Sequence, residues 1–600
     1  MCRITVIKGS LCSHAGIDKK VDALQQYGST LKQELFEEND IKIYLNRFPV
    51  TTTKFKSGEF PLSSRTLVLA FNGEVYSYQD QKFSFSAELS DAHFALKIIE
   101  EVGHERFFSE ADFEGTFVVY ERKTQKVFVY VDQLNTKGCF YSITPGSIII
   151  SQELSIVHNL AELNTENKDA AINLLKRGHC LSISYNNKAE ITEYKPDFRA
   201  IWNGGSLDHP EIKASKLYDA LKQSVADRLP KEGDFGMLCG GGVDSSLLFK
   251  IILDLLSERR ELHRLKVFTL GTPLNPLRGE DNDLENAYYL MEYFNLIPSD
   301  IYKVIYPSES WNNFLLNEGV LPGKTGSPFL ITPNPSQTQV RHVITMSCVL
   351  AQAVIKFPDI RVMITGDFAD ELFGGYNSMH NGNIGDLQQN IQHKLDDLPL
   401  NDASRVTLAS LRGCKFLIEK LIEGALKTSG SLPVNNAWHP VEIRTPFASP
   451  LIAKVLSDFP ASNLVGRRSA NDKKIHSKYL LRLTAMKAGV PESIAWRKKI
   501  PFNEGGTGVR NTEPYVLEEQ AAKNYFSHTP YIPRKEDQVK LQKLGLKSHI
   551  SCEPMNSYEH ALYVSAANAG LNRLMAGNGF RSIMPDSNYA SSGNLDNLYN

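Results

Sequence analysis

The spacing of hydrophobic and polar residues divides the chain into two regions with different periodicities. From Ile4 to about Lys195, short segments rich in β-branched and aromatic residues are separated by turn residues, which is typical of strands. The predicted strands are Ile4–Lys8, Leu67–Tyr78, Thr116–Glu121, Lys126–Asp132 and Ser147–Gln152. A helix is predicted over Asp91–Glu101, with Ser90 as its N-cap. We therefore expect an α+β domain with antiparallel sheets.

Beyond a loop-like segment, Pro196–Pro210, the pattern becomes a repeated succession of strand, turn and helix. The predicted pairs are Phe235–Leu238 with Ser245–Leu256, Leu265–Leu270 with Asp283–Phe294, and Arg361–Thr365 with a helix near Asp370. This alternation is typical of a doubly wound parallel sheet. Residues 377–432 have a polar, helical pattern, and the polar tail from about Asp586 is expected to be disordered. We expect domains over residues 1–200 and 211–520, and an extension over 521–600.

Composition and charge exclude several classes of protein. With 42% hydrophobic and 22% charged residues, the 600-residue chain has the composition of a globular enzyme. The net charge of −2 provides no general attraction to nucleic acid or to an anionic membrane. No apolar run approaches the ~20 residues of a membrane span, and the N-terminus MCRITVIKGS lacks a signal-peptide pattern. The eight cysteines form no CxxC pair, which argues against a disulfide framework or a zinc site. We expect a cytoplasmic protein.

The stretch FGMLCGGGVDSSLLF, residues 235–249, places three glycines between a predicted strand and a predicted helix. Glycines allow a ligand to approach the backbone, and the helix N-terminus offers free N–H groups and positive dipole charge to an anion. The segment matches neither GxxxxGK[ST] nor GxGxxG. It suits a pyrophosphate bound by the amides of Gly240, Gly241 and Gly242 and by the hydroxyls of Ser245 and Ser246, with Asp244 available for Mg²⁺. The structural alternative is a capped glycine-rich turn.

A second motif, TGDFADELFGGY, spans Thr365–Tyr376 and follows the predicted strand Arg361–Thr365. Its acidic residues Asp367, Asp370 and Glu371 are expected at the carboxyl edge of the sheet, where α/β proteins bind ligands. Three carboxylates in five positions repel one another unless a cation lies among them. The structural alternative is a helix start with a charged first turn.

Together these motifs resemble the asparagine synthetase family. GGGVDSS resembles the SGGxDSS pyrophosphate loop of ATP-pyrophosphatase enzymes, and TGDFADELFGGY resembles the family's GxxADExFGGY. The resemblance implies an α/β doubly wound ATP-pyrophosphatase domain that uses ATP and Mg²⁺, with Asp244 and Asp370 holding the metal on the pyrophosphate and Glu371 among the catalytic residues. Residues implied to border the adenosine are Thr269, Gly271, Thr365 and Gly366, with Asp283 and Leu284 beside them.

Two later segments extend the resemblance. VPESIAWRKKIPF, Val490–Phe502, resembles the family's WRxKxxF segment, and Lys499 would then neutralise the charge that develops as pyrophosphate leaves. VEIRTPF contains Glu442 and Arg444 and matches another family segment near the active site. Taken alone, each of these charged side chains is more often a solvated surface group.

The N-terminus matches the glutaminase half of the same family, an N-terminal nucleophile (Ntn) hydrolase-type domain. Cys2 becomes the first residue when Met1 is removed, and its free amine can act as base for the thiol. AFNGEVY matches the family's NGExY, which implies an oxyanion hole from Asn72 and Gly73 and a glutamine contact from Glu74. Arg47 would bind the α-carboxylate of glutamine, because guanidinium groups bind carboxylates bidentately. Asp91 would bind its α-amine.

Several positions depart from the family pattern. Arg3 stands where the family usually has Gly, and YGST, Tyr27–Thr30, stands near the place of its RGPD motif. Gly240 replaces the first Ser of SGGxDSS, which removes one hydroxyl contact to phosphate. The segment that approaches aspartate is loosely matched by Thr338–Met346, where Arg341 is the candidate carboxylate contact. The acceptor therefore stays open between aspartate and a specialised carboxylate.

The expected function is that of a glutamine-dependent amidotransferase that adenylates a carboxylate with ATP and amidates it with ammonia. Its partners would be glutamine and a small-molecule carboxylate, with no nucleic acid and no membrane, and a homodimer is left open. A β-lactam-synthetase-like or peptide-cyclising ligase would use an internal amine, but such relatives commonly lose the cysteine that this chain has as Cys2. A catalytically inactive binding protein would leave Asp244, Asp370 and Lys499 unexplained. A tRNA-modifying relative would favour a basic excess that is missing.

Overall fold

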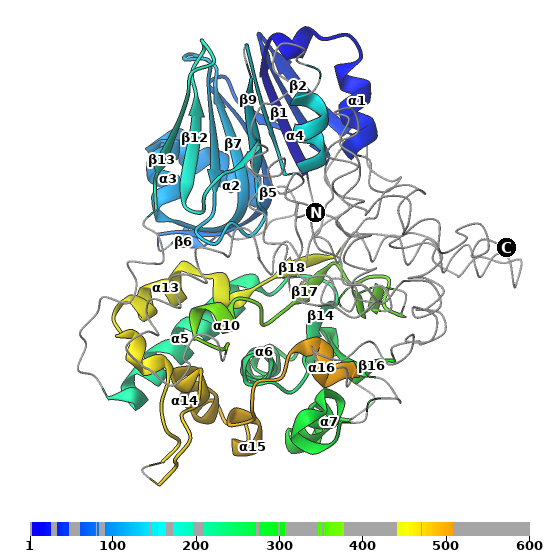
Figure 1. The fold of residues 1–600 in the computed structure, drawn as a ribbon, viewed down its shortest axis with the longest axis vertical. Helices are drawn as coiled ribbons and strands as arrows, with labels where there is room; N and C mark the ends of the chain where they lie inside the picture. Colours follow the sequence, from blue (N-terminus) through cyan, green and yellow to red (C-terminus); the bar gives the residue numbers. More distant parts are fainter. Residues whose placement is uncertain are drawn as a thin grey trace, which may run out of the picture.

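The computed structural model of the chain describes two successive assemblies of secondary structure (Figure 1). The described residues are 3–25, 33–46, 61–79, 81–82, 90–144, 146–152, 154–161, 163, 172–195, 209–271, 275, 277–297, 301–305, 346, 349–350, 353–354, 356–376, 441–469 and 471–507. The predicted helical stretch 377–432, the tail from Asp586 and most of Pro196–Pro210 lie outside these residues. Within the described part of the chain, no helix has the length and apolar character needed to cross a membrane.

Two antiparallel sheets form the N-terminal assembly. The six-stranded sheet has the order β11-β9-β10-β1-β3-β2, and the seven-stranded sheet has the order β13-β12-β8-β7-β5-β4, with β6 beside β5. The strands of the first sheet, in that order, are Ile172–Leu174, Phe140–Thr144, Ser147–Ser151, Arg3–Gly9, Ile41–Asn46 and Gln33–Glu38. Those of the second are Ala189–Glu193, His179–Ile183, Lys126–Val131, Ala111–Glu121, Leu67–Tyr78 and Leu62–Ser63, with β6 at Gln81–Lys82.

The two sheets pack face to face and helices cover their outer faces. Side chains of both sheets, among them Val6, Ile43 and Val118, form one buried cluster. Helices α2 (Asp91–Val102) and α3 (His104–Glu110) close a second cluster on the seven-stranded sheet, while α4 (Leu154–Ala161) packs on β9 and β10 beside α1 (Ile17–Gln25). This helix, sheet, sheet, helix arrangement confirms the predicted antiparallel α+β domain.

The C-terminal assembly is built on a five-stranded parallel sheet of order β16-β15-β14-β17-β18. Its strands, in that order, are Ile301–Ile305, Leu265–Gly271, Phe235–Leu238, Val362–Ile364 and Glu442–Arg444. The first strand in the chain, β14, is central, and later strands add on one side and then on the other. The predicted doubly wound parallel sheet is thereby confirmed, and its topological switch point lies between β14 and β17.

Helices surround this sheet and share one large core with it. They are α5 Pro210–Arg228, α6 Val243–Arg259, α7 Asp283–Tyr293, α10 Ala369–Leu372, α13 Pro450–Ser457, α14 Tyr479–Lys487 and α15 Glu492–Ala495. A further helix, α16 (Phe502–Thr507), packs on β15 and α7. Leu134 of the N-terminal assembly belongs to the same core, so apolar packing continues across the junction between the two assemblies.

Comparison with the predicted elements shows where sequence patterns mislead. The strands β5 and β14 have the predicted bounds, and α6 begins two residues earlier than predicted, at Val243. The strand β7 begins at Ala111 and not at Thr116. The prediction missed its first residues because Asp112 and Glu114 are charged, a pattern that does not indicate a buried strand. The helix predicted near Asp370 is a single turn.

Candidate functional site

Two loops meet at the switch point of the parallel sheet. The glycine segment Gly240–Gly242 follows β14, and Thr365 and Gly366 follow the neighbouring strand β17. The loops are in contact, because a Cβ added to Gly366 would lie 3.4 Å from the Cβ of Asp244. The parallel sheet therefore brings together two sequence motifs that are far apart in the chain.

The glycine loop has no room for side chains at its first two positions. A Cβ on Gly241, whose φ is +71°, would lie 2.5 Å from the Cβ of Asn286. A Cβ on Gly240 would lie 2.7 Å from Oδ2 of Asp283. The position where the family has a serine is therefore packed against a buried carboxylate in this chain. The backbone of the loop is thus fixed from the side of α7.

The hydroxyl groups predicted to bind phosphate differ in access. Ser245 lies in the first turn of α6 and donates a hydrogen bond to the carbonyl of Gly242 at 3.3 Å. Ser246 is fully buried, and its hydroxyl has no hydrogen-bond partner among the described residues. Of the two, Ser245 is the more accessible to a ligand at the loop.

Two lysines join the carboxylates of both motifs. The Nζ of Lys478 lies 2.6 Å from Oδ1 of Asp370 and donates a hydrogen bond to Oδ2 of Asp244. The Nζ of Lys499 donates to Oδ2 of Asp370 at 2.7 Å. The Lys478 side chain is only 2% exposed, so its ammonium group faces carboxylates and not water. Asp370 is therefore held by two ammonium groups, one of which reaches the glycine loop.

The charges at this cluster are set by their neighbours. Although burial opposes ionisation, Lys478 and Lys499 hold the pKa of Asp370 well below its ordinary value. Burial raises the pKa of Glu371, as does the adjacent charge of Asp370, and Glu371 accepts a hydrogen bond of 2.6 Å from the Tyr376 hydroxyl. Two neighbouring carboxyl groups thus have pKa values displaced in opposite directions, an arrangement that recurs at catalytic sites.

The second glycine of the FGGY sequence explains how Lys478 reaches Asp370. A Cβ on Gly375 would lie 1.9 Å from Oδ1 of Asp370 and 2.3 Å from Cε of Lys478. The Gly375 amide also donates to the carbonyl of Asp370 at 2.7 Å. The motif therefore contains a glycine at the point where the lysine passes the aspartate.

Arg497 ties the glycine loop to the start of α7. Its Nη1 donates to the carbonyl of Gly240 at 2.9 Å, and its Nη2 donates to Oδ1 of Asp283 at 2.7 Å. Both charged side chains are buried, and burial raises the pKa of Asp283 to about 6 against the effect of Arg497. Arg497 lies two residues before Lys499, so this ion pair also fixes the segment that carries the catalytic lysine candidate.

The residues predicted to border adenosine lie on the adjacent strand β15. Thr269 donates a hydrogen bond of 2.7 Å to the carbonyl of Cys239, which precedes the glycine loop. Gly271 ends the strand, where a Cβ would lie 2.9 Å from the Leu284 side chain. Together with Thr365 and Gly366, these residues line the same edge of the sheet as the glycine loop.

The predicted oxyanion-hole residues lie in the N-terminal assembly, on β5. The Nδ2 of Asn72 donates to Oε1 of Gln152 at 2.9 Å, and the amide of Ile4 donates to the same oxygen at 3.3 Å. Gly73 pairs with Gly115 of β7, and a Cβ on Gly73 would lie 2.8 Å from the Cα of Gly115. Asn72 is thus linked through one glutamine to the first strand of the chain.

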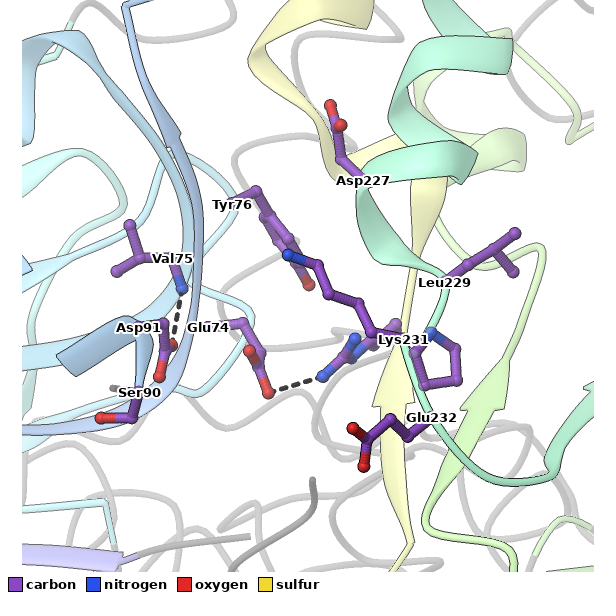
Figure 2. A pocket seen from close by; sticks show the side chains of 11 residues that line it. Glu74, Val75, Tyr76, Ser90, Asp91, Asp227, Leu229, Lys231 and Glu232 are labelled. Carbon is purple, nitrogen blue, oxygen red and sulfur yellow. Dashed lines mark hydrogen bonds and ion pairs between the residues drawn. The ribbon is translucent and has the colours of Figure 1, made fainter. Parts of the chain in front are cut away.

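A pocket opens beside these residues, between the two assemblies (Figure 2). Glu74 and Asp91, both predicted to bind glutamine, line it on one side, and Arg444 and the segment 227–232 line it on the other. Its residues are Glu74, Val75, Tyr76, Ser90, Asp91, Asp227, Leu229, Pro230, Lys231, Glu232 and Arg444. With four carboxylates against two cationic side chains, the lining favours a cation.

The two acids in the pocket have different partners. Oε1 of Glu74 accepts a hydrogen bond of 2.6 Å from Nη2 of Arg444, and Oδ2 of Asp91 accepts one of 3.0 Å from the amide of Val75. Burial raises the pKa of Asp91 to about 6, and it raises the pKa of Glu74 well above its ordinary value despite Arg444. The side chain of Arg444 thus forms an ion pair with Glu74 of the predicted glutamine site. Its backbone carbonyl accepts a hydrogen bond of 3.1 Å from the amide of Thr365.

Both the N-terminal and the C-terminal assembly are similar in sequence to known protein families. A family described as a glutamine amidotransferase domain matches residues 1–209, and one described as asparagine synthase matches residues 216–305. A probable asparagine synthetase (glutamine-hydrolyzing) of Dictyostelium discoideum is 24% identical over 571 residues, which span 88% of this chain and 90% of that protein. The asparagine synthetase (glutamine-hydrolyzing) of Pongo abelii is 23% identical over 483 residues, spanning 76% and 74%.

The two domains occur in the predicted order. These matches support the predicted resemblance to the asparagine synthetase family. The relatives are named glutamine-hydrolyzing asparagine synthetases, and these matches support an ATP-dependent amidotransferase ligase. Among solved structures, the allosteric regulatory enzyme of purine biosynthesis matches 46% of this chain and 60% of its own, at 11% identity and a TM-score of 0.22.

The sequence analysis missed some residues of the candidate sites, and other predicted site residues lie outside the described structure. Cys2 and Arg47 are among the residues that the structure does not describe, as are residues 338–345 of the Thr338–Met346 segment. Sequence reasoning did not single out Lys478 or Gln152. No local pattern indicates Gln152.

The carboxylates of the synthetase domain suit a magnesium ion. Oδ1 of Asp244 is buried and has no hydrogen-bond partner among the described residues, so it offers an oxygen ligand. Asp370 adds a second carboxylate that stays ionised. The described residues contain no cluster of three or more metal-ligating side chains, so Mg²⁺ here would take its remaining ligands from phosphates and water.

Proposed function

We propose that this protein is a glutamine-dependent amidotransferase that adenylates a carboxylate with ATP, releasing pyrophosphate, and amidates it with ammonia from glutamine. The observation that carries the proposal is the cluster at the switch point, where Lys478 and Lys499 join Asp370 to Asp244 beside the glycine loop. We assign residues 1–200 to the glutaminase domain, 211–520 to the synthetase domain and 521–600 to a C-terminal extension.

In the synthetase domain, the loop Gly240–Gly242 would hold pyrophosphate with its amides and with the N-terminus of α6. The hydroxyl of Ser245 would add a hydrogen bond, whereas Ser246 would support the loop from the core. Thr269, Gly271, Thr365 and Gly366 would border the adenosine. Mg²⁺, held by Asp244 and Asp370, would neutralise charge on the phosphates.

Lys499 and Lys478 would stabilise the charge that moves onto pyrophosphate as the acyl-adenylate forms. Both ammonium groups already lie against Asp370, so they need only exchange a carboxylate oxygen for a phosphate oxygen. Glu371, which accepts a hydrogen bond from Tyr376 and has a raised pKa, would exchange a proton with the incoming ammonia nitrogen.

In the glutaminase domain, the Cys2 thiolate would attack the amide of glutamine, and Asn72 with the Gly73 amide would stabilise the tetrahedral oxyanion. Arg47 would bind the α-carboxylate. Glu74 and Asp91 would bind the α-ammonium group in a pocket whose lining favours a cation. Water would then release glutamate, and ammonia would pass to the acyl-adenylate in the adjoining domain.

The acceptor is the substrate to be identified. The test measures pyrophosphate release by the full-length protein with MgATP and glutamine across a panel of carboxylates that includes aspartate, sugar uronates and amino-acid derivatives. Aspartate-dependent release with asparagine as product would make aspartate the acceptor, and release with another carboxylate only would make the protein a specialised amidotransferase. If pyrophosphate release is the same with and without glutamine, and the same in Cys2→Ala as in wild type, the proposal is overturned in favour of a cyclising ligase.

The pocket predicts a pH dependence of glutamine use. Because the pKa of Asp91 is raised to about 6, its carboxylate is ionised above that pH and protonated below it. A neutral Asp91 cannot pair with the α-ammonium group, so kcat/KM for glutamine should fall up to tenfold per pH unit below about pH 6. Glutamate formation measured from pH 5 to 8 checks this expectation.

Asp91→Asn and the ATP site provide the controls for this pH profile. The Asp91→Asn variant should have a raised KM for glutamine at every pH, without the acid limb. The KM for ATP should not follow the same titration, because the pKa of Asp370 lies below its ordinary value. An acid limb that persists in Asp91→Asn would contradict the assignment.

A further inference from the structure

Two buried glutamates face each other on neighbouring strands of the glutaminase domain. Glu74 of β5 is paired in register with Glu114 of β7, and directly opposed residues of an antiparallel pair lie on the same side of the sheet. Asp112 lies two residues before Glu114 and is also buried. Like charges in this position repel each other, so the two strands need counter-charges to stay together.

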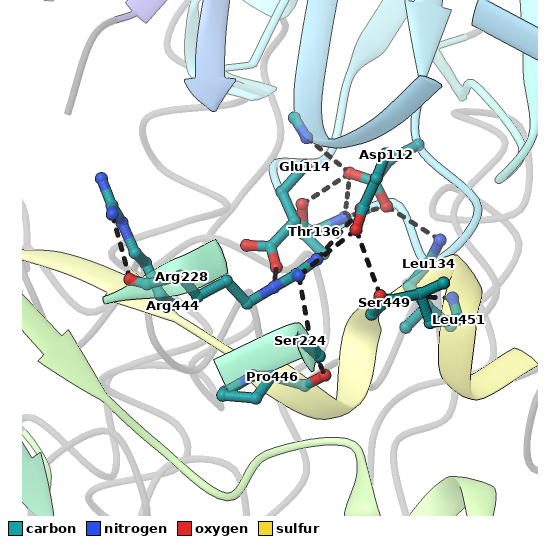
Figure 3. A network of polar contacts seen from close by, with 12 residues as sticks. Asp112, Glu114, Leu134, Thr136, Ser224, Arg228, Arg444, Pro446, Ser449 and Leu451 are labelled. Atoms are coloured by element: carbon teal, nitrogen blue, oxygen red, sulfur yellow. Dashed lines mark hydrogen bonds and ion pairs between the residues drawn. The ribbon is translucent and has the colours of Figure 1, made fainter. Parts of the chain in front are cut away.

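The counter-charges come from the synthetase domain (Figure 3). Arg228, at the end of α5, donates from Nε to Glu114 at 2.7 Å and from Nη2 to Asp112 at 3.2 Å. Its side chain has no exposed surface, and its guanidinium carbon lies 4.1 Å from the centroid of the Tyr76 ring. Arg444 donates to Glu74 in the same way. Each glutamate of the opposed pair is thus bound by an arginine of the other domain.

The two arginines are also bonded to each other and to the synthetase site. Nη1 of Arg444 donates to the carbonyl of Arg228 at 3.1 Å, and its Nε donates to Glu442 at 2.7 Å. The same Arg444 pairs with Thr365 through its backbone. Ser449 adds a hydrogen bond of 3.2 Å to Asp112. A continuous set of polar contacts therefore runs from β7 and β5 to the carboxyl edge of the parallel sheet.

The opposed glutamates adjoin the proposed oxyanion hole. Gly73 precedes Glu74, and a Cβ on Gly73 would lie 1.8 Å from the carbonyl oxygen of Glu114. The strands β5 and β7 are in such close contact here that any repulsion between Glu74 and Glu114 must move Gly73 as well. The position of the Gly73 amide consequently depends on the charges that hold these strands together.

We propose that Arg228 and Arg444 are positioning residues for glutamine hydrolysis, although both belong to the synthetase domain. They neutralise the opposed glutamates and so hold Asn72 and Gly73 in the geometry that stabilises the oxyanion. The glutaminase site is then complete only when the two domains are docked. This inference rests on the proposed function, because it needs glutamine hydrolysis as the reaction that is positioned.

The test compares two activities in one set of full-length variants. Glutamate formation from glutamine reports the glutaminase site, and pyrophosphate release with an ammonium salt in place of glutamine reports the synthetase site. Arg228→Met should lower kcat for glutamine at least tenfold while ammonia-dependent pyrophosphate release stays within about twofold of wild type. Lys222→Met, on the same helix but in an exposed pair with Glu258, should leave both activities unchanged.

Charge removal distinguishes positioning from general damage. In the background of Arg228→Met, the change Glu114→Gln removes the uncompensated carboxylate. The double variant should therefore have a kcat for glutamine several-fold higher than that of Arg228→Met alone. If Arg228→Met does not fold, Arg228→Lys takes its place, since it keeps the charge but cannot bridge both acids, and it should show the same selective loss in smaller degree.

Other outcomes overturn the inference. Equal losses of the two activities, an unchanged glutamine kcat, or no recovery with Glu114→Gln would each show that Arg228 does not position the glutaminase site. A wild-type protein that forms no glutamate would instead overturn the proposed function. The wild-type measurement thus separates failure of the inference from failure of the function on which it rests.

Discussion

Replacing Asp370 by asparagine is expected to reduce ATP-dependent pyrophosphate release by at least about 10²-fold. The carboxylate meets both Lys478 and Lys499, and it is one of the two proposed ligands of Mg²⁺. A neutral amide would leave the buried ammonium group of Lys478 and the partly exposed one of Lys499 without the counter-charge they share, and it would weaken the binding of the metal. Pyrophosphate release with saturating acceptor and an ammonium salt is the measurement, so that glutamine hydrolysis plays no part.

Two controls make the Asp370 result specific. Breaking a buried ion pair costs ~3–5 kcal/mol, so glutamate formation by Asp370→Asn must stay near wild type to show that the protein is folded. Asp281→Asn removes a carboxylate paired with Lys498 at 2.5 Å on the surface, one residue from Lys499, and should change pyrophosphate release by less than twofold. Retention of pyrophosphate release in Asp370→Asn would contradict the proposed site.

Cys2→Ala is expected to abolish glutamine-dependent amide formation, with a loss of about 10³-fold or more, because no other group supplies the nucleophile. Amide formation supported by an ammonium salt should persist, since the acyl-adenylate forms in the synthetase domain. Glutamate and amide are measured in the same reaction, with glutamine and with ammonium salt in turn.

Cys12 offers a matched control near the same end of the chain. Burial raises the pKa of the Cys12 thiol to about 12, so this thiol is not ionised at neutral pH and cannot act as the nucleophile. Cys12→Ala should therefore form glutamate at nearly the wild-type rate. Glutamate formation that survives Cys2→Ala but is lost in Cys12→Ala would overturn the assignment of the nucleophile.

Local patterns predicted the elements that carry the candidate sites. The β5 strand has the predicted bounds, and so does β14, because their hydrophobic content and flanking turn residues are visible within a few positions. The parallel arrangement followed from the alternation of strands and helices. The predicted strand Arg361–Thr365 placed Asp370 at a carboxyl edge of the sheet, and the family resemblance joined it to Asp244 of the glycine segment.

Contacts between distant segments could not be predicted in the same way. Lys478 follows a basic, polar segment and has the sequence context of a surface lysine, yet it is buried between Asp244 and Asp370 because Gly375 leaves it room. The first residues of β7 were missed because Asp112 is charged, and its burial in a strand is compensated by Arg228 and Ser449 of the other domain.

The sequence by itself determined the two sheet types, the order in which they follow along the chain and the chemical character of each motif, since these depend on periodicity and on neighbouring residues. The tertiary structure decided which charges meet. Glu74 and Arg444 were assigned separately, one to glutamine and one to the synthetase site, and they form a single ion pair of 2.6 Å. The reason is physical: the energy of a charged side chain depends on its burial and on the counter-charge beside it, and both are set by chain segments that are remote in sequence.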